Sequence, residues 1–355
     1  MAFEIDISKD KEKSFINSLR KAMQSCNINF ILGSGCSYPF IHVLGDIENQ
    51  IKTEIDKGNN TKVNELLFSF LSPFADYMEF ISNNDQNDKF SLTLGYYTSF
   101  IQNISNILFH RKNNILHKQA SVFTTNYDLF FELAYQSFSN NILLFDGFSR
   151  KPSVNKEFIF STSEYFNTVY NIGNIYNYQV EIPSINLLKI HGSLNWHIKG
   201  NTIYNSTDHF TDVIRLSKSG NAKDIECFID SFSVVLPKKD KFKETIINQV
   251  YYDMLRIFAN VLDKENTLLI AEGFSFSDEH ILDIIKRGLR NPTLKLIIFC
   301  YLKEELEAFS RKFSTFNNVE IVYSTVTNID FQSFNDILHC VLPDYLQKVN
   351  TDNKG

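Results

Sequence analysis

The stretch INFILGSGCS, residues 28–37, joins a short apolar run to a loop that contains two glycines. Ile28–Leu32 is brief and almost continuously apolar, which is typical of a parallel strand covered on both faces of its sheet. Gly33-Ser34-Gly35-Cys36-Ser37 follows directly, and glycines there allow a tight turn and a close approach of backbone N–H groups to a diphosphate. The third glycine of the usual dinucleotide fingerprint is missing, so this loop alone also fits an ordinary turn.

Five further apolar runs have the same character, and helical patterns follow three of them. The runs are Ser121–Thr124, Leu187–Ile190, Leu268–Ala271, Leu294–Phe299 and Val319–Tyr323. The helical patterns cover Leu129–Phe138, Asp278–Leu289 and Lys303–Phe313. Alternation of strands and helices predicts an α/β fold with a doubly wound, mostly parallel, Rossmann-like sheet.

Three intervals interrupt this alternation. Residues at about 50–118 have apolar side chains at helical spacing, whereas about 140–184 is rich in Asn, Ser and Tyr without a clear period. The segment at about 200–243 is mixed and polar, and is either a cap over the sheet or surface loops. We expect one domain over residues 1–355, with a helical insertion in the first interval and an irregular insertion or cap in the other two.

Composition and charge narrow the class of protein. The 355 residues are 43% hydrophobic and 21% charged, which is ordinary for a globular chain, and the net charge of −6 does not favour nucleic-acid binding. The basic run Lys238, Lys239, Lys241 and Lys243 is more readily a solvated surface. Five scattered cysteines without a C-x-x-C pair, together with the absence of a signal or membrane-spanning segment, favour a cytoplasmic protein.

Polar motifs follow three of the other predicted strands, as the glycine loop follows the first. Ligands of open α/β sheets bind beyond the carboxyl ends of the strands, so these motifs are expected to converge. After Ser121–Thr124 come Thr125, Asn126 and Asp128. Asp128 is a candidate helix cap, whereas Asn126 is expected to point toward the crevice.

The third strand runs into His191-Gly192-Ser193-Leu194-Asn195-Trp196. A histidine at a strand end is suited to proton transfer near neutral pH, and we expect Gly192 to open space beside it. Trp196 and His197 either line the same pocket or pack in the core.

The fourth strand runs into Gly273-Phe274-Ser275-Phe276-Ser277-Asp278. Gly273 permits backbone approach, and Ser275 is able to bond a phosphate or ribose. Ser277 or Asp278 is expected to cap the next helix. Asp278, Glu279 and His280 are consecutive and face different sides of a helix, so a metal site there is not expected.

The four motifs, in this order, resemble those of the sirtuin-like NAD-binding family. The matching stretches are Gly33–Ser37, Thr125–Asp128, His191-Gly192 and Gly273-Phe274-Ser275. The sequence motifs FTTNYD, KIHGSLNW and GFSFSDEH resemble those of a subgroup that acts in bacterial antiphage defence. Val235-Leu236-Pro237 and the lysines that follow are similar to members of this subgroup that pair with a HerA-type ATPase.

The resemblance implies a role for each matched position. Asn126 would hold the nicotinamide ribose and orient a water, and His191 would act as general base. The loop Gly33, Ser34, Gly35, Cys36 and Ser37 would cradle the pyrophosphate. Ser275, with Gly273 and Phe274, would contact the phosphate or adenosine ribose, and Thr125 and Asp128 would bind near the nicotinamide.

Two departures from the family pattern bear on the reaction. The sirtuin zinc ribbon and the D-F-R element are both missing, so no zinc is expected and protein deacylation is disfavoured. The resemblance therefore implies a hydrolase that cleaves the nicotinamide–ribose bond of its substrate NAD, in antiviral defence. A deacylase and a non-catalytic module that binds NAD or ADP-ribose remain alternatives. A homo-oligomer and a HerA-type hexameric ATPase partner are implied by resemblance, whereas a membrane or direct nucleic-acid contact is not.

Overall fold

A computed structural model gives the fold of the chain. It describes residues 2–8, 11–41, 47–113, 115–138, 142–149, 158–173, 179–199, 202–219, 221–234 and 247–343. Lys238–Lys243, the basic run, lies outside the described residues. Among the described helices, none combines the length and the apolar character needed to cross a lipid bilayer.

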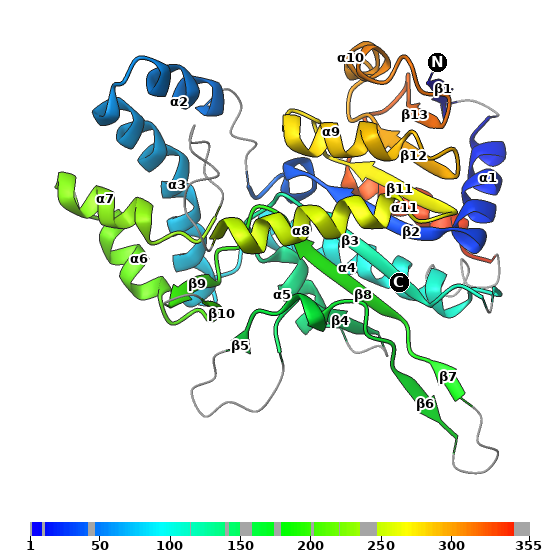
Figure 1. Cartoon of the computed structure of the whole chain (residues 1–355), viewed down its shortest axis with the longest axis horizontal. Helices are drawn as coiled ribbons and strands as arrows, with labels where there is room; N and C mark the ends of the chain where they lie inside the picture. Colours follow the sequence, from blue (N-terminus) through cyan, green and yellow to red (C-terminus); the bar gives the residue numbers. More distant parts are fainter. Residues whose placement is uncertain are drawn as a thin grey trace.

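An eight-stranded parallel sheet forms the centre of the molecule (Figure 1). Its strand order is β1-β13-β12-β11-β2-β3-β8-β4. The strands are β1 (Phe3–Asp6), β2 (Asn27–Leu32), β3 (Gln119–Thr124), β4 (Leu143–Phe145), β8 (Ser184–Lys189), β11 (Thr267–Glu272), β12 (Leu294–Phe299) and β13 (Val319–Tyr323). The six central strands have the order 3-2-1-4-5-6 of dinucleotide-binding folds, so the predicted fold class is confirmed.

Each central strand contributes to two hydrophobic cores because its side chains alternate between the faces of the sheet. In β2, Phe30 belongs to the larger core and Ile31 to the smaller one. In β11, Ile270 and Ala271 divide in the same way. Burial on both faces explains why the predicted strands are nearly continuous apolar runs.

Helices cover the two faces. The larger core includes residues of α1 (Lys11–Ser25), α4 (Asp88–Phe109), α5 (Phe130–Gln136) and α11 (Phe331–Val341). The smaller core includes residues of α8 (Ile247–Leu262), α9 (Glu279–Gly288) and α10 (Glu305–Lys312). In Figure 1, α8 and α9 lie in front of the sheet, and α4 and α11 lie behind it.

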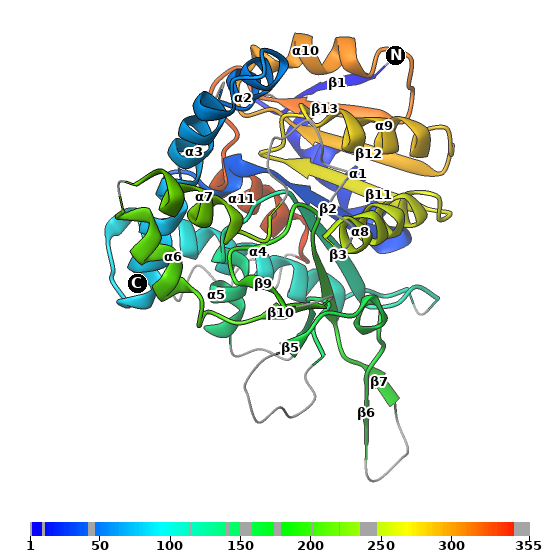
Figure 2. The ribbon, with the colours of Figure 1, turned by 60° about the vertical axis from the view of Figure 1, so that its left-hand side comes forward.

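A helical lobe stands beside the carboxyl ends of the strands (Figures 1 and 2). It contains α2 (Ile47–Asp56), α3 (Asn60–Ser82), α6 (Phe210–Ser217) and α7 (Ala222–Asp230). The first two helices come from the interval expected to be helical, and the last two come from the polar segment after residue 200. Phe68 of α3 contacts Phe228 of α7 with ring centroids 5.2 Å apart, which joins the two segments.

The interval at about 140–184 is more ordered than its sequence predicts. It contains β4, β5 (Phe158–Ile159), the short 3-10 helix η2 (Thr162–Glu164), β6 (Tyr170–Ile172) and β7 (Gln179–Glu181). Strand β5 pairs with β10 (Thr202–Asn205), which pairs with β9 (Trp196–Lys199) in a second sheet. Strands this short carry too few residues to show a period, so the sequence predicts an irregular segment here.

Candidate functional site

All predicted site residues lie in four segments at the carboxyl edge of the sheet. The segments follow β2, β3, β8 and β11, and the first forms the 3-10 helix η1 (Ser34–Ser37). Strands β2 and β11 are neighbours, and the chain leaves them toward opposite sides of the strand order. The segments therefore surround the position where open α/β sheets bind nucleotides.

The two glycine loops contact each other. Gly33 donates its N–H to the carbonyl oxygen of Glu272 at 3.0 Å, and Gly35 donates to that of Gly273 at 3.1 Å. A Cβ atom on Gly33 would lie 2.2 Å from the Gly273 oxygen. These glycines thus permit close packing of one loop on the other, and their N–H groups bind the carbonyls of Glu272, at the end of β11, and of Gly273.

We expect Gly33→Ala to destabilise the fold by about 1–3 kcal/mol or more, since both clashing groups are backbone. Gly95→Ala is the matched control, because Gly95 lies within α4 with open space at its Cβ position. That control should stabilise by roughly 0.5–1 kcal/mol. Urea unfolding of both variants measures the difference, and equal stabilities would contradict the loop contact.

The β11–α9 loop turns sharply at Gly273, which has a φ of +59°. Phe274 is buried, whereas Ser275 is exposed and its hydroxyl donates to Ser277 Oγ at 2.9 Å. Asp278 caps α9, as predicted for Ser277 or Asp278, because its Oδ1 accepts the N–H groups of His280 and Ile281. Ser34, Ser275 and Ser277 are therefore the serines whose side chains are exposed on these two loops.

Asn126 is held by a buried hydrogen-bond network. Its Nδ2 donates to the Gly33 carbonyl oxygen at 2.9 Å and also lies 3.2 Å from Ser37 Oγ. Ser37 donates to Asp128 Oδ2 at 2.7 Å, so the Tyr97 hydroxyl, 2.9 Å from Ser37 Oγ, is the donor of that bond. Since the Gly33 carbonyl requires a donor, the amide nitrogen faces the loop. Asn126 Oδ1 accepts no hydrogen bond from a described residue.

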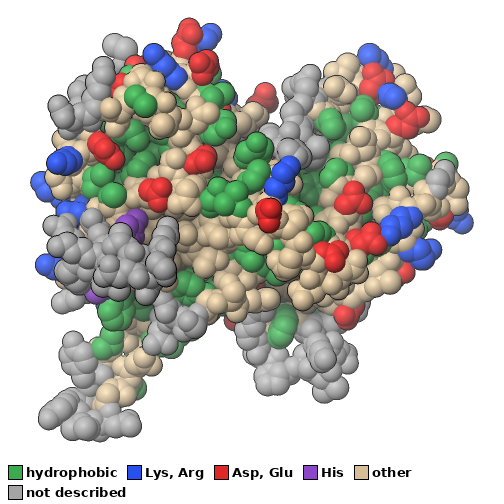
Figure 3. Space-filling view, turned by 180° about the vertical axis from the view of Figure 1, so that it is seen from behind, with side chains coloured by type: hydrophobic (Ala, Val, Ile, Leu, Met, Phe, Trp, Pro, Cys, Tyr) green, Lys and Arg blue, Asp and Glu red, His purple; other side chains and the backbone are tan. Residues whose placement is uncertain are grey.

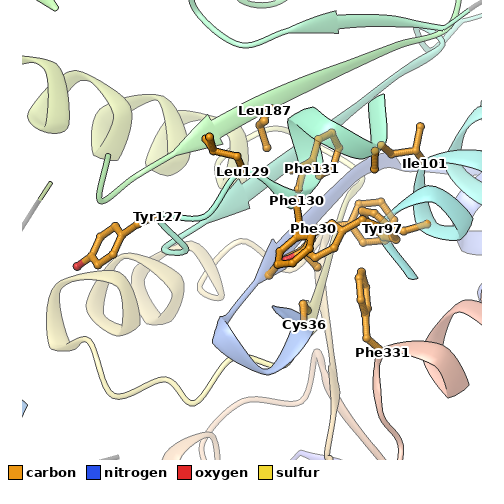
Figure 4. Close-up of a cluster of buried hydrophobic side chains, with 14 of the residues drawn as sticks. Phe30, Cys36, Tyr97, Ile101, Tyr127, Leu129, Phe130, Phe131, Leu187 and Phe331 are labelled. Carbon is orange, nitrogen blue, oxygen red and sulfur yellow. The ribbon is translucent and has the colours of Figure 1, made fainter. Parts of the chain in front are cut away.

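Tyr97 comes from α4, outside every predicted site segment. Burial and the charge of Asp128 raise its pKa well above the usual value, so its hydroxyl stays protonated and able to donate. The ring stacks on Phe130 with centroids 5.8 Å apart. Figure 4 shows Tyr97 close to Phe130 and Phe30, with Cys36 nearby. Cys36 is itself buried, and burial raises the pKa of its thiol, so it remains neutral.

Asp128 and Lys189 fix the segment after β3. Asp128 Oδ1 accepts the N–H of Phe130 at 3.1 Å, but the N-cap of α5 is Leu129, so Asp128 is not the helix cap expected from the sequence. Lys189, at the end of β8, donates to the Asp128 carbonyl oxygen and pairs with Glu132 at 2.8 Å. Both side chains of that pair are largely buried. The half-buried Thr125 lies in the same segment.

His191 forms a pair with Asp278 across the edge of the sheet. The distance between His191 Nε2 and Asp278 Oδ2 is 3.0 Å, and the two side chains are 17% and 18% exposed. The pair links the segments after β8 and β11, which are separated in the sheet by β2 and β3. No described residue contacts His191 Nδ1 through a hydrogen bond or ion pair. In the neutral ring, Nε2–H donates to the carboxylate and Nδ1 keeps its lone pair.

Gly192 does not open space beside His191, which corrects the expectation from sequence. Its φ is +88°, and a Cβ there would lie 2.4 Å from the Tyr251 hydroxyl. The position that a Cβ atom would occupy is already filled, so Gly192 allows neighbouring groups to pack closely against the backbone. Trp196 also packs, in a small core with Phe148.

Asn126 and His191 occupy equivalent positions just beyond the ends of neighbouring strands. Thr124 of β3 is in register with Lys189 of β8, and each site residue lies two positions further along. Among the described contacts, no hydrogen bond joins Asn126 to His191. The two segments are nevertheless tied together, since the Leu194 N–H donates to the Tyr127 carbonyl oxygen at 3.0 Å.

Glu272 is a buried acid that the sequence analysis did not single out. It ends β11, is 3% exposed, and its Oε2 has no hydrogen-bond partner among the described residues. Burial, with the charges of Asp330 and Glu305, raises its pKa well above the usual value. The described residues contain no cluster of three or more metal-binding side chains here or elsewhere.

We expect Glu272→Gln to stabilise the protein at neutral pH. A raised folded pKa means that the native state holds the proton longer, so wild-type stability falls as pH rises from the unfolded pKa, about 4.3, to the folded value. A glutamine side chain has the same shape as the protonated glutamate, but it does not titrate, so the variant does not lose stability as the pH rises. Thermal unfolding between pH 4.5 and 8 should show a widening difference, at roughly 1–2 °C per kcal/mol for this length. Parallel curves for the two proteins would contradict the raised pKa.

The profile of a family described as "SIR2-like domain" matches residues 120–321, more than half of the chain. The matched region contains Asn126, His191 and Gly273, but begins after Gly33. A search of curated proteins finds no match.

Proposed function

The chain belongs to the SIR2-like family, and on this premise we propose that it hydrolyses NAD to nicotinamide and ADP-ribose. The family indicates NAD-related chemistry in general. In the proposed reaction the bond between the nicotinamide nitrogen and the ribose C1′ breaks, and its electron pair leaves with nicotinamide. The oxygen of a water bonds to C1′, and a proton passes from that water to a base.

The His191–Asp278 pair is the observation that supports hydrolysis most directly. A carboxylate that accepts the Nε2–H fixes the tautomer of the ring, so that Nδ1 carries the lone pair. Nδ1 is the nitrogen without a partner among the described residues. We propose that Nδ1 accepts the proton of the attacking water or of a ribose hydroxyl.

Asn126 supplies a second fixed group. Three acceptor oxygens lie around its Nδ2, so the amide cannot rotate without breaking its bond to Gly33. Its Oδ1 is left to accept a hydrogen bond from a ribose hydroxyl or from the water. Departure of nicotinamide develops positive charge on the ribose, which such a preorganised dipole stabilises.

Substrate placement follows from the two loops. The N–H groups of Gly33 and Gly35 already bind the carbonyls of Glu272 and Gly273. We therefore assign contact with the diphosphate and the adenosine ribose to Ser34 and Ser275, which are exposed on the two loops. Cys36 and Ser37 act from inside the fold, by packing and by holding Asn126.

Incubation of the purified chain with NAD tests the proposal. Chromatography should show nicotinamide and ADP-ribose appearing in equal amounts, without an acylated peptide. A requirement for an acyl-lysine peptide, with O-acyl-ADP-ribose as product, would instead identify a deacylase. NAD binding without turnover, alone and with the candidate ATPase, would identify a non-catalytic module.

We further propose that the reaction serves antiviral defence in the cytoplasm, within a homo-oligomer that a HerA-type ATPase regulates. The sequence motifs support this proposal. An enzyme that depletes NAD harms its own cell, so its activity requires control. Co-purification with the candidate ATPase tests the association. If the chain, expressed in cells without the ATPase, were fully active and did not arrest growth, the proposed regulation would be contradicted.

A further inference from the structure

A groove of about 1030 Å³ opens between α8, α9 and the segment that joins α10 to β13. Its walls do not include Asn126, His191 or the glycine loops. Lys312, which lines the groove, donates to the carbonyl oxygens of Ser275 and Phe276 at 3.1 and 3.0 Å. The groove therefore adjoins the β11–α9 loop but is separate from the proposed NAD site.

Five cationic residues from three segments line the groove. Arg256 comes from α8, Lys286 and Arg287 from the last turn of α9, Arg290 from the residues after it, and Lys312 from the end of α10. Asp283 is the acidic residue among the lining side chains. A basic last turn also complements the dipole of α9, but that explanation does not cover Arg256, Arg290 or Lys312.

These charges are mostly uncompensated. Within the described part of the chain, no ion pair involves Lys286, Arg287 or Arg290. Arg256 has a partner, since it lies 3.2 Å from Asp253. Burial and the nearby charge of Lys286 lower the pKa of Lys312, which is consistent with two cations lying close together in the groove.

The local charge contrasts with the rest of the chain. The net charge is −6, and on the face seen in Figure 3 acidic and basic side chains are interspersed. A concentration of one sign in a concave site attracts ligands of the opposite sign and is a functional signal rather than a solubility device.

Apolar and aromatic side chains share the groove. Tyr252 of α8 is 62% exposed, and Leu255, Ile284 and Phe316 also line the walls. An exposed aromatic ring beside arginines fits a base that stacks while its phosphates bind the cations. The volume is at the upper end of the range for small-molecule sites.

We propose that this groove binds a nucleotide that carries two or more phosphates. Its phosphates contact Arg287, Arg290 and Lys286, and its base lies against Tyr252 or Phe316. A free nucleotide fits better than a nucleic-acid strand, because the cations gather in one hollow rather than along a stripe.

Calorimetry with ATP as the probe tests the proposal. The wild-type chain should bind ATP with a Kd that increases as the salt concentration is raised, and it should not bind adenosine. Arg287→Gln/Arg290→Gln should weaken ATP binding by about 10-fold or more, since it removes two charge-assisted contacts. The exposed positions of both residues let the variant keep its Tm.

Two controls separate the groove from other effects. Lys57→Gln/Lys62→Gln removes the same charge from exposed positions in the helical lobe and should bind ATP as the wild type does. His191→Ala should also leave ATP affinity unchanged, so a failure of the proposed NAD reaction would not affect this result. Unchanged affinity in the groove variant, no ATP binding by the wild type, or tighter binding of a single-stranded oligonucleotide than of ATP would each overturn the proposal.

Discussion

Replacing His191 with alanine should lower the rate of NAD hydrolysis by about 100-fold to 10,000-fold, because general-base assistance is lost. The ring is 17% exposed and pairs with Asp278, so its removal also costs some packing. The Tm must therefore show that the variant is still folded at the temperature of the assay. The measurement is the initial rate of nicotinamide release at saturating NAD, together with the Tm of both proteins.

Asp278→Asn separates the two roles of the carboxylate. Asparagine is itself a good helix cap, so α9 should remain intact. Its amide, however, no longer holds the Nε2–H tautomer with a negative charge. We expect a smaller loss of rate than in His191→Ala and a changed pH–rate profile, which a purely structural role would not produce. Retention of most activity in His191→Ala would remove this residue from catalysis.

Much of the fold could be predicted from the sequence because buried parallel strands are short, continuous apolar runs. All six predicted runs overlap strands of the sheet. The two outer strands, β1 and β4, could not be predicted from the sequence for physical reasons. Strand β1 is an edge strand whose first two residues, Phe3 and Glu4, are exposed, and β4 has only three residues. Neither carries a double-sided apolar signal.

The site was only partly predictable, since strand ends locate motifs but not their contacts. The position of Asn126 followed from the end of β3, yet Tyr97 reaches it from α4, where an aromatic residue at helical spacing looks like any core residue. Lys189 lies within an apolar strand and gives no separate signal. The His191–Asp278 pair spans the ends of two intervening strands, which no local pattern shows. The contact of Gly33 with Gly273 is likewise tertiary.

Asn126→Ala should reduce NAD hydrolysis by about 100-fold to 1,000-fold, comparable to the loss of one preorganised dipole in other active sites. The variant removes the Oδ1 assigned to the ribose or water, and it also leaves the Gly33 carbonyl oxygen without its side-chain donor. That second effect should cost about 1–3 kcal/mol of stability. Rates must therefore be compared at a temperature where both proteins are folded.

Tyr97→Phe distinguishes the chemical role of Asn126 from its support. Phenylalanine keeps the stacking on Phe130 but removes the hydroxyl that bonds Ser37. Asn126 keeps its 2.9 Å bond to Gly33, so the amide should stay in place and the rate should fall by less than about 10-fold. If Tyr97→Phe were as inactive as Asn126→Ala, the buried network as a whole, rather than the Asn126 oxygen, would be what the reaction requires. If Asn126→Ala were nearly fully active, His191 would have to position the water without this amide.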